Sequence, residues 1–331
     1  YGLRKGDKKS QHQAVETLLP EALKADPSNV DAFVFGGYCY LSKHDWSHAK
    51  TWVEDALKIN PNHAIATLGL AGCANAGQEK QAAEQALQRA LSLNSSLREA
   101  IIAGAAEVIR KRQWGPAAEA IQKALQVDPN HPETLAYAAF CDLMQRNPDG
   151  AAARTKLAHE LNPKPAVFWY TLGDLHGNRL LFEEAQSYLD KAVECDPNNW
   201  DAVLAAGMNA LRLGREEQAQ RQIDLATLKD PFNMWGMNTW RLLRDYEKKF
   251  TVKLSPHYKM RFHNTEVEFM EPYVVAIAED CWKTLAARYK FAPAEPVLLE
   301  MFPNHDDLSV RTFGLGGLGI LGACFGKVVT L

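Results

Sequence analysis

The residues whose types and spacing suggest chemistry first are histidines. His44-Asp45-Trp46-Ser47-His48 has the spacing of a zinc-binding H-E-x-x-H motif, with aspartate where the general base would stand. We expect His44 and Asp45 to lie in a turn, so that the two imidazoles do not share one helix face. A second fragment, His159-Glu160, has one histidine and is followed by Pro163, which would end a helix. We therefore reject both as metal sites.

A glycine-rich stretch is the second feature with chemical potential. Residues 314–319 read G-L-G-G-L-G and fit the G-x-G-x-x-G fingerprint of nucleotide-binding proteins. No convincing strand precedes them, and the chain stops before an acidic ribose partner about 20 residues on. We interpret the stretch as a loop. No Ser/His/Asp or Cys/His arrangement stands out, although a triad assembled only in space would leave no such trace. For this chain we predict no catalytic residue, metal ligand or cofactor.

Composition narrows the class of protein. The chain has 331 residues, which at roughly 150 per domain predicts about two domains. Hydrophobic residues make up 47%, charged residues 23%, and the formal net charge is −3. This is a globular balance without a basic block, so neither nucleic-acid binding nor a polybasic membrane anchor is supported. No apolar run approaches the ~18 residues of a membrane span.

The cysteines and the chain ends give two further expectations. The six cysteines are scattered without a C-x-x-C pair, which predicts buried, reduced thiols. This favours a reducing, cytoplasmic compartment over a secreted or periplasmic one. The chain begins without methionine and ends in apparent mid-strand, so we expect a fragment of a longer protein. Residues 1–10 form an N-terminal extension.

Proline marks a regular spacing. An Asp or Asn precedes Pro at six places that lie 34 residues apart, except for one gap of 68, namely Pro27, Pro61, Pro129, Pro163, Pro197 and Pro231. In the middle of that gap, Asn94-Ser95 keeps the spacing with serine in place of proline. The alignment gives a half unit at residues 11–28 and six full units, which start at Val30, Ala64, Arg98, Pro132, Ala166 and Trp200.

Small residues recur at fixed positions of these units. The twentieth and twenty-seventh positions are alanine in all six units, and the eighth is glycine or alanine. Such positions indicate helices that cross in close contact, where a larger side chain would overpack at a cost of about 1–3 kcal/mol. The prolines fall where each second helix ends.

This pattern resembles the tetratricopeptide repeat (TPR) family, whose unit is a 34-residue helix–turn–helix. The resemblance implies a mainly α fold, a right-handed α-solenoid over residues 11–231, with neighbouring units burying a shared core. The aromatic residue that is usual at the fourth position survives only as Phe33 and Trp169. Residues 232–250 are predicted to form one capping helix.

The resemblance also implies a concave groove lined by the first helix of each unit, mainly at its second, fifth, ninth, twelfth and thirteenth positions. Transferred to this chain, these positions predict a mostly apolar peptide-binding groove of Val34, Tyr38, Leu41, Leu68, Ile102, Ile109, Arg110, Phe140, Leu143, Met144, Tyr170, Asp174, Asn178, Leu204, Met208, Leu211 and Arg212.

The groove predicts a protein-interaction scaffold that binds a peptide or protein segment. Equally open is occupation of the groove by another part of the same polypeptide, or by a second copy. The Lys/Arg/Asn clamp with which some TPR domains hold a C-terminal carboxylate is not assembled, because only Arg110, Asn178 and Arg212 stand near its positions. We therefore do not expect binding of chaperone tails.

After residue 251 the periodicity changes to that of a small α+β domain. Residues 258–263 alternate like a half-buried strand, 264–289 have helical spacing, and 296–302 form a short apolar strand. Asn304 or Asp306 is predicted to cap a further helix, and residues 323–331 to form a last strand. Because that strand has no visible continuation, we expect an unpaired sheet edge and a possible homodimer there.

Residues 302–329 of this domain resemble the entry to a bacterial peptidase-MA-like domain, a gluzincin zinc-metallopeptidase fold. In that family the H-E-x-x-H helix lies downstream, so the resemblance implies an incomplete domain at residues 251–331. The alternative function is therefore the N-terminal, substrate-positioning part of a zinc peptidase whose zinc site lies beyond residue 331. A third possibility is an assembly factor whose peptidase-like domain has lost its zinc ligands.

Overall fold

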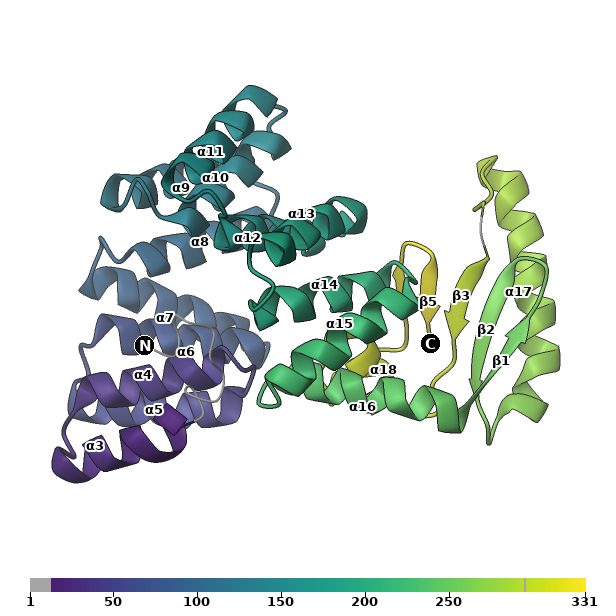
Figure 1. The fold of residues 1–331 in the computed structure, drawn as a ribbon, viewed down its shortest axis with the longest axis horizontal. Helices are drawn as coiled ribbons and strands as arrows, with labels where there is room; N and C mark the ends of the chain where they lie inside the picture. The colour runs from purple at the N-terminus through teal and green to yellow at the C-terminus, as the bar shows by residue number, and fades with distance from the viewer. Residues whose placement is uncertain (1–12, 295) are drawn as a thin grey trace. The chain divides into compact units, whose positions relative to one another are not determined.

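The computed structural model describes residues 13–294 and 296–331, which form two compact units (Figure 1). The first unit extends to Asn178 and includes Ser187–Ala202; the second comprises Arg179–Gln186 and Val203–Leu331. The predicted extension at residues 1–10 and the first two residues of the predicted half unit lie outside the described residues. The remainder of the half unit forms a π-helical turn, η1 (Ala14–Leu18), and α3 (Leu19–Ala25).

Helix pairs follow the 34-residue spacing, which confirms the predicted solenoid of mainly α class. Each predicted unit start is the first residue of a helix: α4 (Val30–Leu41), α6 (Ala64–Ala76), α8 (Arg98–Arg110), α10 (Pro132–Met144), α12 (Ala166–Gly177) and α14 (Trp200–Arg212). The second helices are α5 (Trp46–Ile59), α7 (Lys80–Leu93), α9 (Trp114–Val127), α11 (Pro148–Leu161), α13 (Phe182–Cys195) and α15 (Glu216–Lys229).

The small residues are buried where helices cross. All twelve alanines of the twentieth and twenty-seventh positions are at most 8% exposed. A Cβ atom added to Gly37 would lie 2.6 Å from Cγ1 of Val53, and one added to Gly207 would lie 2.8 Å from Cγ1 of Ile223. The predicted close contact between paired helices is confirmed at both glycines.

The Asp or Asn before each proline explains why one unit keeps its register without proline. Its side-chain Oδ1 accepts a hydrogen bond of 3.0–3.1 Å from the backbone N–H two residues later, at Asp26, Asn60, Asn94, Asp128, Asn162 and Asp196. This side-chain turn forms equally well before serine, so Asn94 sets the chain path without the help of a ring.

The turn between the two helices of each unit has a backbone conformation that the sequence analysis did not predict. The fifteenth position adopts a left-handed backbone in all six units, with φ of 59–73°, at His44, Gln78, Arg112, Arg146, Leu180 and Gly214. Only the last of these is glycine, the residue that accepts this conformation without steric cost. The other five turns therefore hold a side chain in a sparsely populated region of backbone space.

Within the second unit, α14 and α15 are followed by α16 (Met234–Lys249) and a five-stranded mixed sheet. Its strands are β1 (Phe250–Leu254), β2 (Tyr258–His263), β3 (Val297–Glu300), β4 (Ala323–Phe325) and β5 (Val328–Thr330), in the order β1-β2-β3-β5-β4. β2, β3 and β5 run parallel, and the outer strands β1 and β4 pair antiparallel to their neighbours.

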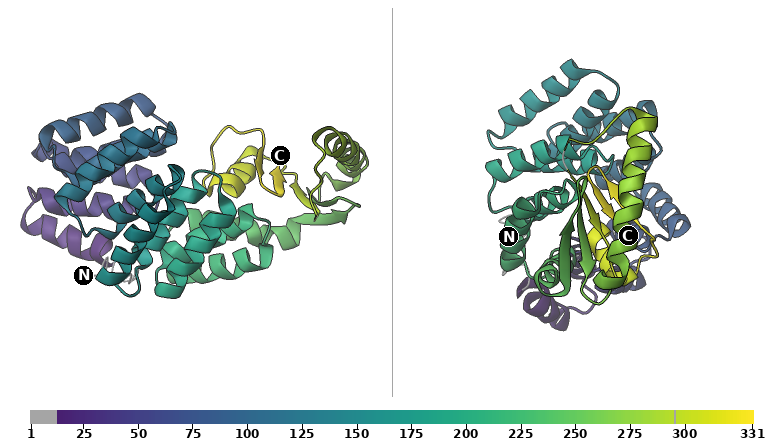
Figure 2. Two further views of the ribbon diagram at one scale, coloured as in Figure 1. Left: turned by 90° about the horizontal axis from the view of Figure 1, so that it is seen from above. Right: turned by 90° about the vertical axis from the view of Figure 1, so that its right-hand side faces the viewer.

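Two helices accompany the sheet. α17 (Val267–Tyr289) packs on one face of β2, as Figure 2 shows in its right-hand view, and α18 (His305–Phe313) contacts α16 and β5. The N–H of Asp307 donates to Oδ1 of Asn304 at 2.8 Å, which confirms Asn304 as the predicted cap of α18.

Two predictions about the strands were wrong. Residues 323–331 form a hairpin instead of one strand, because Gly326, with φ of 57°, reverses the chain between β4 and β5. The last strand, β5, therefore lies between β3 and β4 and is not an edge; β1 and β4 are the edges. In addition, β1 was missed: the predicted capping helix ended at residue 250, and no strand was predicted before residue 258.

The cysteines are all free thiols, as predicted, but not all are buried. Cys39, Cys73 and Cys141 are buried in the repeats, and burial raises the pKa of these thiols to about 11, 11 and 12. They are therefore unreactive at neutral pH. Cys281 and Cys324 are exposed, against the prediction. Among the described residues, no helix is long and apolar enough to cross a membrane.

Candidate functional site

The predicted groove side chains divide into three groups by exposure. Eight are buried: Val34, Leu68, Ile102, Ile109, Phe140, Leu204, Met208 and Leu211. Six are half-buried: Tyr38, Leu41, Leu143, Met144, Tyr170 and Arg212. Three are exposed: Arg110, Asp174 and Asn178. Leu204, Met208, Leu211 and Arg212 belong to the second unit, so only the other thirteen share the first.

The buried group packs between successive repeats. Ile102, Ile109 and Phe140 belong to one core cluster with the alanines of neighbouring helices, and Leu68 packs with Leu97 and Ala100. A side chain at these positions faces the next helix pair, since each unit covers the apolar face of its neighbour. In the described state these side chains form core contacts and present little surface to a partner.

Polar side chains remain on the same helix faces. Glu99, Glu133 and Asp201 occupy the second position of their units, Tyr170 the fifth, Tyr137 the sixth, and Tyr38 and Asp174 the ninth. These positions are spaced by three or four residues, so they share one helix face. We call this set the inner face: Tyr38, Glu99, Glu133, Tyr137, Tyr170, Asp174 and Asp201.

The groups of the inner face influence one another electrostatically. Burial raises the pKa of Tyr170, and the carboxylates of Asp174, Asp201 and Glu133 raise it further. Burial also raises the pKa of Glu133, opposed by Arg98 and reinforced by Glu99 and Asp174. The inner face is thus a partly desolvated set of phenol donors and carboxylate acceptors.

Several contacts hold this set in place. The Tyr38 hydroxyl donates to the backbone oxygen of Ile65 at 3.1 Å, and the Asn178 amide donates to Asp174 at 2.9 Å. Tyr137 and Tyr170 pack against the core cluster of the first unit. Aromatic rings with a polar tip, fixed in this way, suit peptide contacts because they bring large area at little cost in conformational entropy.

The sequence prediction overlooked four members of the inner face, namely Glu99, Glu133, Tyr137 and Asp201. The repeat of acidic residues at the second position was visible in the alignment and was the signal available. This signal is weak by itself, because a lone acidic residue at a helix N-terminus usually serves the helix dipole.

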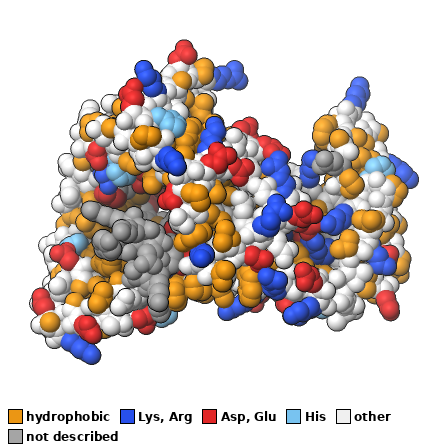
Figure 3. Space-filling model, in the orientation of Figure 1, with side chains coloured by type: hydrophobic (Ala, Val, Ile, Leu, Met, Phe, Trp, Pro, Cys, Tyr) orange, Lys and Arg blue, Asp and Glu red, His pale blue; other side chains and the backbone are white. Residues whose placement is uncertain are grey.

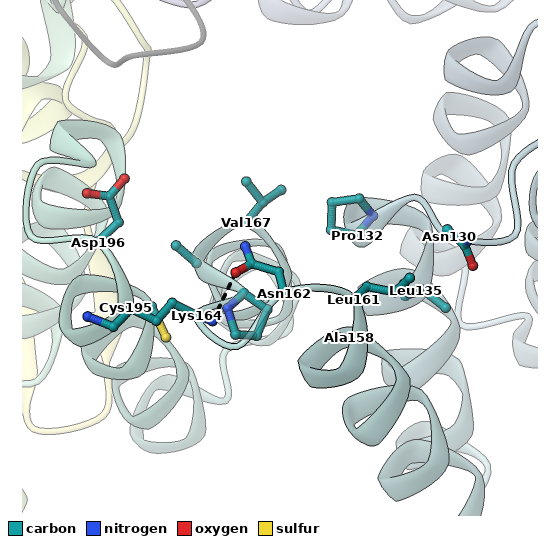
Figure 4. Close-up of a pocket in the computed structure, with 12 residues that line it drawn as sticks. Asn130, Pro132, Leu135, Ala158, Leu161, Asn162, Lys164, Val167, Cys195 and Asp196 are labelled. Atoms are coloured by element: carbon teal, nitrogen blue, oxygen red, sulfur yellow. Dashed lines mark hydrogen bonds between the residues drawn. The ribbon is translucent and has the colours of Figure 1, made fainter.

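A cavity of about 460 Å³ lies elsewhere in the first unit, where second helices end and first helices begin (Figure 4). Its walls combine apolar and polar groups: Asn130, Pro132, Leu135, Ala158, Leu161, Asn162, Lys164, Pro165, Ala166, Val167, Cys195 and Asp196. The volume is within the range of small-ligand sites. In the wall of this inter-repeat pocket the Lys164 N–H donates to Oδ1 of Asn162 at 3.0 Å, as the dashed line in Figure 4 marks.

The sequence look-alikes have structural explanations. Asp45 caps α5 by accepting from the N–H of His48, while His44 lies in the left-handed turn before it, as expected. Gly314 ends α18 with φ of 76°, so the glycine stretch follows a helix instead of opening one. Among the residues that the structure describes, no three His, Cys, Asp or Glu side chains gather as metal ligands would.

The second unit contains a buried charge cluster that the sequence did not reveal. Nε of Arg311 lies 2.7 Å from Oε2 of Glu300, and both side chains are 1% exposed. Arg261 pairs with Glu300 and with Glu216, and the Tyr246 hydroxyl donates to Glu300 at 3.0 Å. The cluster joins α15 and α16 to β2, β3 and α18, so its arrangement is that of a structural brace.

On the face that Figure 3 shows, acidic and basic side chains alternate and neither forms a continuous block. This distribution lacks the single-sign field typical of a nucleic-acid interface.

Comparisons with known proteins agree with the repeat architecture. Residues 40–97 and 166–199 match family models described as tetratricopeptide repeat. The search of curated proteins returned no match. These two segments therefore match tetratricopeptide repeats, and the helix pairs form an α-solenoid. TPR proteins act as protein-interaction scaffolds.

Solved structures that this chain matches include pilF of Pseudomonas aeruginosa, with 20% identity and a TM-score of 0.40, over 62% of this chain and 93% of that chain. The Cut9–Hcn1 hetero-tetramer of the APC/C has 16% identity and a TM-score of 0.45, over 72% and 46%. YrrB, described as a TPR protein with an unusual peptide-binding site, has 22% identity and a TM-score of 0.32, over 57% and 97%.

Proposed function

We propose that this chain is a protein-interaction scaffold whose first unit binds a peptide or protein segment along the inner face. The observation that supports this most is that tyrosines and carboxylates occupy one face of helices whose other faces pack on buried alanines. The contacts between units are filled mainly by buried small residues such as Ala66, Ala100 and Ala136, so the exposed polar tips of the inner face are available to a partner.

The charges of the inner face favour a particular kind of segment. The inner face has four carboxylates, of Glu99, Glu133, Asp174 and Asp201. Two guanidinium groups lie nearby: Arg98 pairs with Glu99, and Arg110 pairs with Glu107. A segment with Lys or Arg beside an apolar residue would pair its cation with a carboxylate and place its apolar part on a tyrosine ring. Of the predicted groove, Tyr38, Leu143, Met144, Tyr170, Asp174 and Asn178 remain accessible enough to contribute.

The test uses a random 12-residue peptide library displayed on phage and selected on the immobilised full chain. We expect enriched sequences to combine Lys or Arg with aromatic or aliphatic residues. Binding of the enriched peptides should weaken by about tenfold or more in Glu133→Gln and Asp174→Asn. Glu84→Gln, an exposed carboxylate on the second helix α7, is the matched control and should change nothing.

Two results would contradict the proposal. One is a selection that enriches no sequence on the full chain. The other is a set of enriched peptides whose affinities are the same for Asp174→Asn as for Glu84→Gln. Enrichment of a segment from this chain's own sequence would instead support self-occupation of the inner face.

A second proposal concerns the parent protein: this chain forms the substrate-positioning part of a zinc peptidase. It is supported by the resemblance of residues 302–329 and by a mixed sheet with antiparallel outer strands. Zinc would be held by residues beyond Leu331, so no catalytic step is assigned to residues of this chain. The full-length gene product should contain zinc and lose proteolysis with a chelator. If the full-length protein neither contains zinc nor loses proteolysis with a chelator, the remaining hypothesis is an assembly factor whose peptidase-like domain has lost its zinc ligands.

A further inference from the structure

The segment before the half unit, residues 1–12, differs in composition from the rest of the chain. Its sequence is Y-G-L-R-K-G-D-K-K-S-Q-H. Four of these residues are cationic, namely Arg4, Lys5, Lys8 and Lys9. Asp7 is the one carboxylate, whereas the whole chain has a net charge of −3. Tyr1 and Leu3 add apolar side chains, so the segment combines Lys or Arg with aromatic and aliphatic residues. This is the composition that the inner face favours.

The inner face concentrates negative charge around one phenol. Burial is the largest cause of the raised pKa of Tyr170, and the carboxylates of Asp174, Asp201 and Glu133 raise it further. Glu133 and Asp174 lie on α10 and α12, which pack against each other. The inner face therefore presents a concave surface of carboxylates and phenol rings that is complementary in charge to a basic segment.

The start of the half unit places the end of residues 1–12 close to this surface. Oε1 of Glu16 in η1 lies 3.5 Å from the Tyr40 hydroxyl of α4, the helix that also carries Tyr38 of the inner face. In every full repeat the inner face is carried by the first helix, and residues 1–12 precede the half unit where a first helix would stand. The segment therefore begins on the side of the repeats that carries the inner face.

The distance along the inner face is within reach of twelve residues. Burial lowers the pKa of His44 in the first repeat, and the Asp201 carboxylate of the sixth repeat opposes that shift, so the two repeats lie within electrostatic range of each other. Twelve extended residues span about 40 Å, and four steps between neighbouring helices take roughly 32–40 Å. The segment can therefore extend from α4 as far as α12.

We propose that residues 1–12 are an intramolecular ligand of the inner face, where they compete with the segment of a partner. This inference rests on the proposed function, because it gives the same surface a regulator from its own chain. The cations of the segment pair with Glu133, Asp174 and Asp201, and its apolar side chains lie on the tyrosine rings of the inner face.

Covalent connection makes a weak contact of this kind effective. A segment that is joined to the surface it binds has an effective concentration on the order of 1 mM. With a dissociation constant of about 100 µM, it occupies the surface roughly ten to one and weakens a competing peptide about tenfold. A partner that binds more tightly still displaces the segment, so the segment sets a threshold for binding.

The first experiment measures competition by fluorescence anisotropy, with a fluorescein-labelled peptide of residues 1–12 as the probe. A chain with Arg4→Gln, Lys5→Gln, Lys8→Gln and Lys9→Gln should bind the probe about tenfold more tightly than the unchanged chain. A chain that begins at residue 13 should show the same gain. Lys80→Gln with Lys123→Gln, at exposed lysines of the second helices α7 and α9, is the matched control and should leave the affinity unchanged.

The second experiment locates the segment by carbodiimide cross-linking, which joins a lysine amine to a neighbouring carboxylate as an amide with loss of water. Mass spectrometry should find links from the lysines of residues 1–12 to Glu133 or Asp174, and none to Glu84 on the second helix α7. In an equal mixture of ¹⁴N and ¹⁵N chains, each link should join residues of the same isotopic label.

Three results would overturn the inference. One is a probe affinity that is the same for the unchanged chain and for the chain that begins at residue 13. The second is a set of links that avoids Glu133 and Asp174. The third is a set of links that joins chains of different label, which would assign the segment to a second copy. If peptides selected from the library still lose affinity in Asp174→Asn, the proposed function stands and only this inference fails. If the chain that begins at residue 13 binds neither the probe nor any library peptide, both fail.

Discussion

Replacing Glu300 by glutamine should destabilise the second unit strongly. Glu300 is 1% exposed, accepts hydrogen bonds from Tyr246 and Arg261, and forms an ion pair with Arg311. Glutamine preserves the volume but removes the negative charge. Arg311, whose side chain is also 1% exposed, would then be a buried cation whose other described acceptor is the Leu211 backbone oxygen, at 3.0 Å.

The magnitude follows from this burial. Removing one partner of a buried pair costs about 3–5 kcal/mol, because the remaining charge loses its compensation. A half-exposed pair provides the control: Arg244 and Asp224 are 44% and 35% exposed at 3.2 Å, so Asp224→Asn should cost less than about 1 kcal/mol. Glu300→Gln with Arg311→Met should cost less than the sum of the single changes, since both members of the pair lose their charge.

The assay is urea unfolding followed by circular dichroism and tryptophan fluorescence. Because the chain has two units, it can unfold in two transitions. Hydrogen exchange should identify the unit whose stability the substitution changes. We expect loss of protection to concentrate in β3 and α18. The interpretation fails if Glu300→Gln costs no more than Asp224→Asn, or if protection is lost in the repeats of the first unit instead.

The remaining predictions concern the repeats. Gly37→Val should destabilise the first unit by about 1–3 kcal/mol in urea unfolding, because its added carbon meets Val53 at 2.6 Å; an unchanged midpoint would contradict the close helix crossing. Leu180→Gly should stabilise by up to about 1 kcal/mol and Gly214→Ala should destabilise similarly, because both positions are left-handed; shifts of equal sign would refute this. Burial lowers the pKa of His44 to about 4, although Asp201 opposes the shift. The unfolded state then binds the proton first, so stability should fall as the pH drops from 6.5 toward 4. His44→Asn, which tolerates the turn, should flatten that slope.

The repeat register followed from the sequence with little loss. All six predicted unit starts are helix starts, because each 34-residue unit is defined by contacts within itself and with its neighbour. Local signals sufficed there: small residues at the crossings, and an Asp or Asn that closes the turn through its own side chain. The cap of α18 at Asn304 was predictable for the same reason.

The groove was harder to predict, because the same helix face both packs against the next repeat and carries the exposed side chains. Family positions identify the side chains on that face but not how deeply the next unit covers them. Phe140 is fully buried, while Asp174, at the same position of the next unit, is exposed. The groove residues themselves thus remain a prediction, with the inner face as its accessible part.

The sequence by itself determined what repeats: the helix pairs, their small crossing residues, and the α+β character of the C-terminal part. The tertiary structure decided what depends on distant residues or on backbone geometry. Arg311 donates a hydrogen bond to the backbone oxygen of Leu211, 100 positions earlier, and no sequence periodicity predicts such a contact. The β4–β5 hairpin and the left-handed turns depend on single φ angles, and the exposure of apolar side chains on α17 depends on which of them the sheet covers. Local interactions depend on residues that are neighbours in the sequence, whereas burial depends on how the whole chain packs.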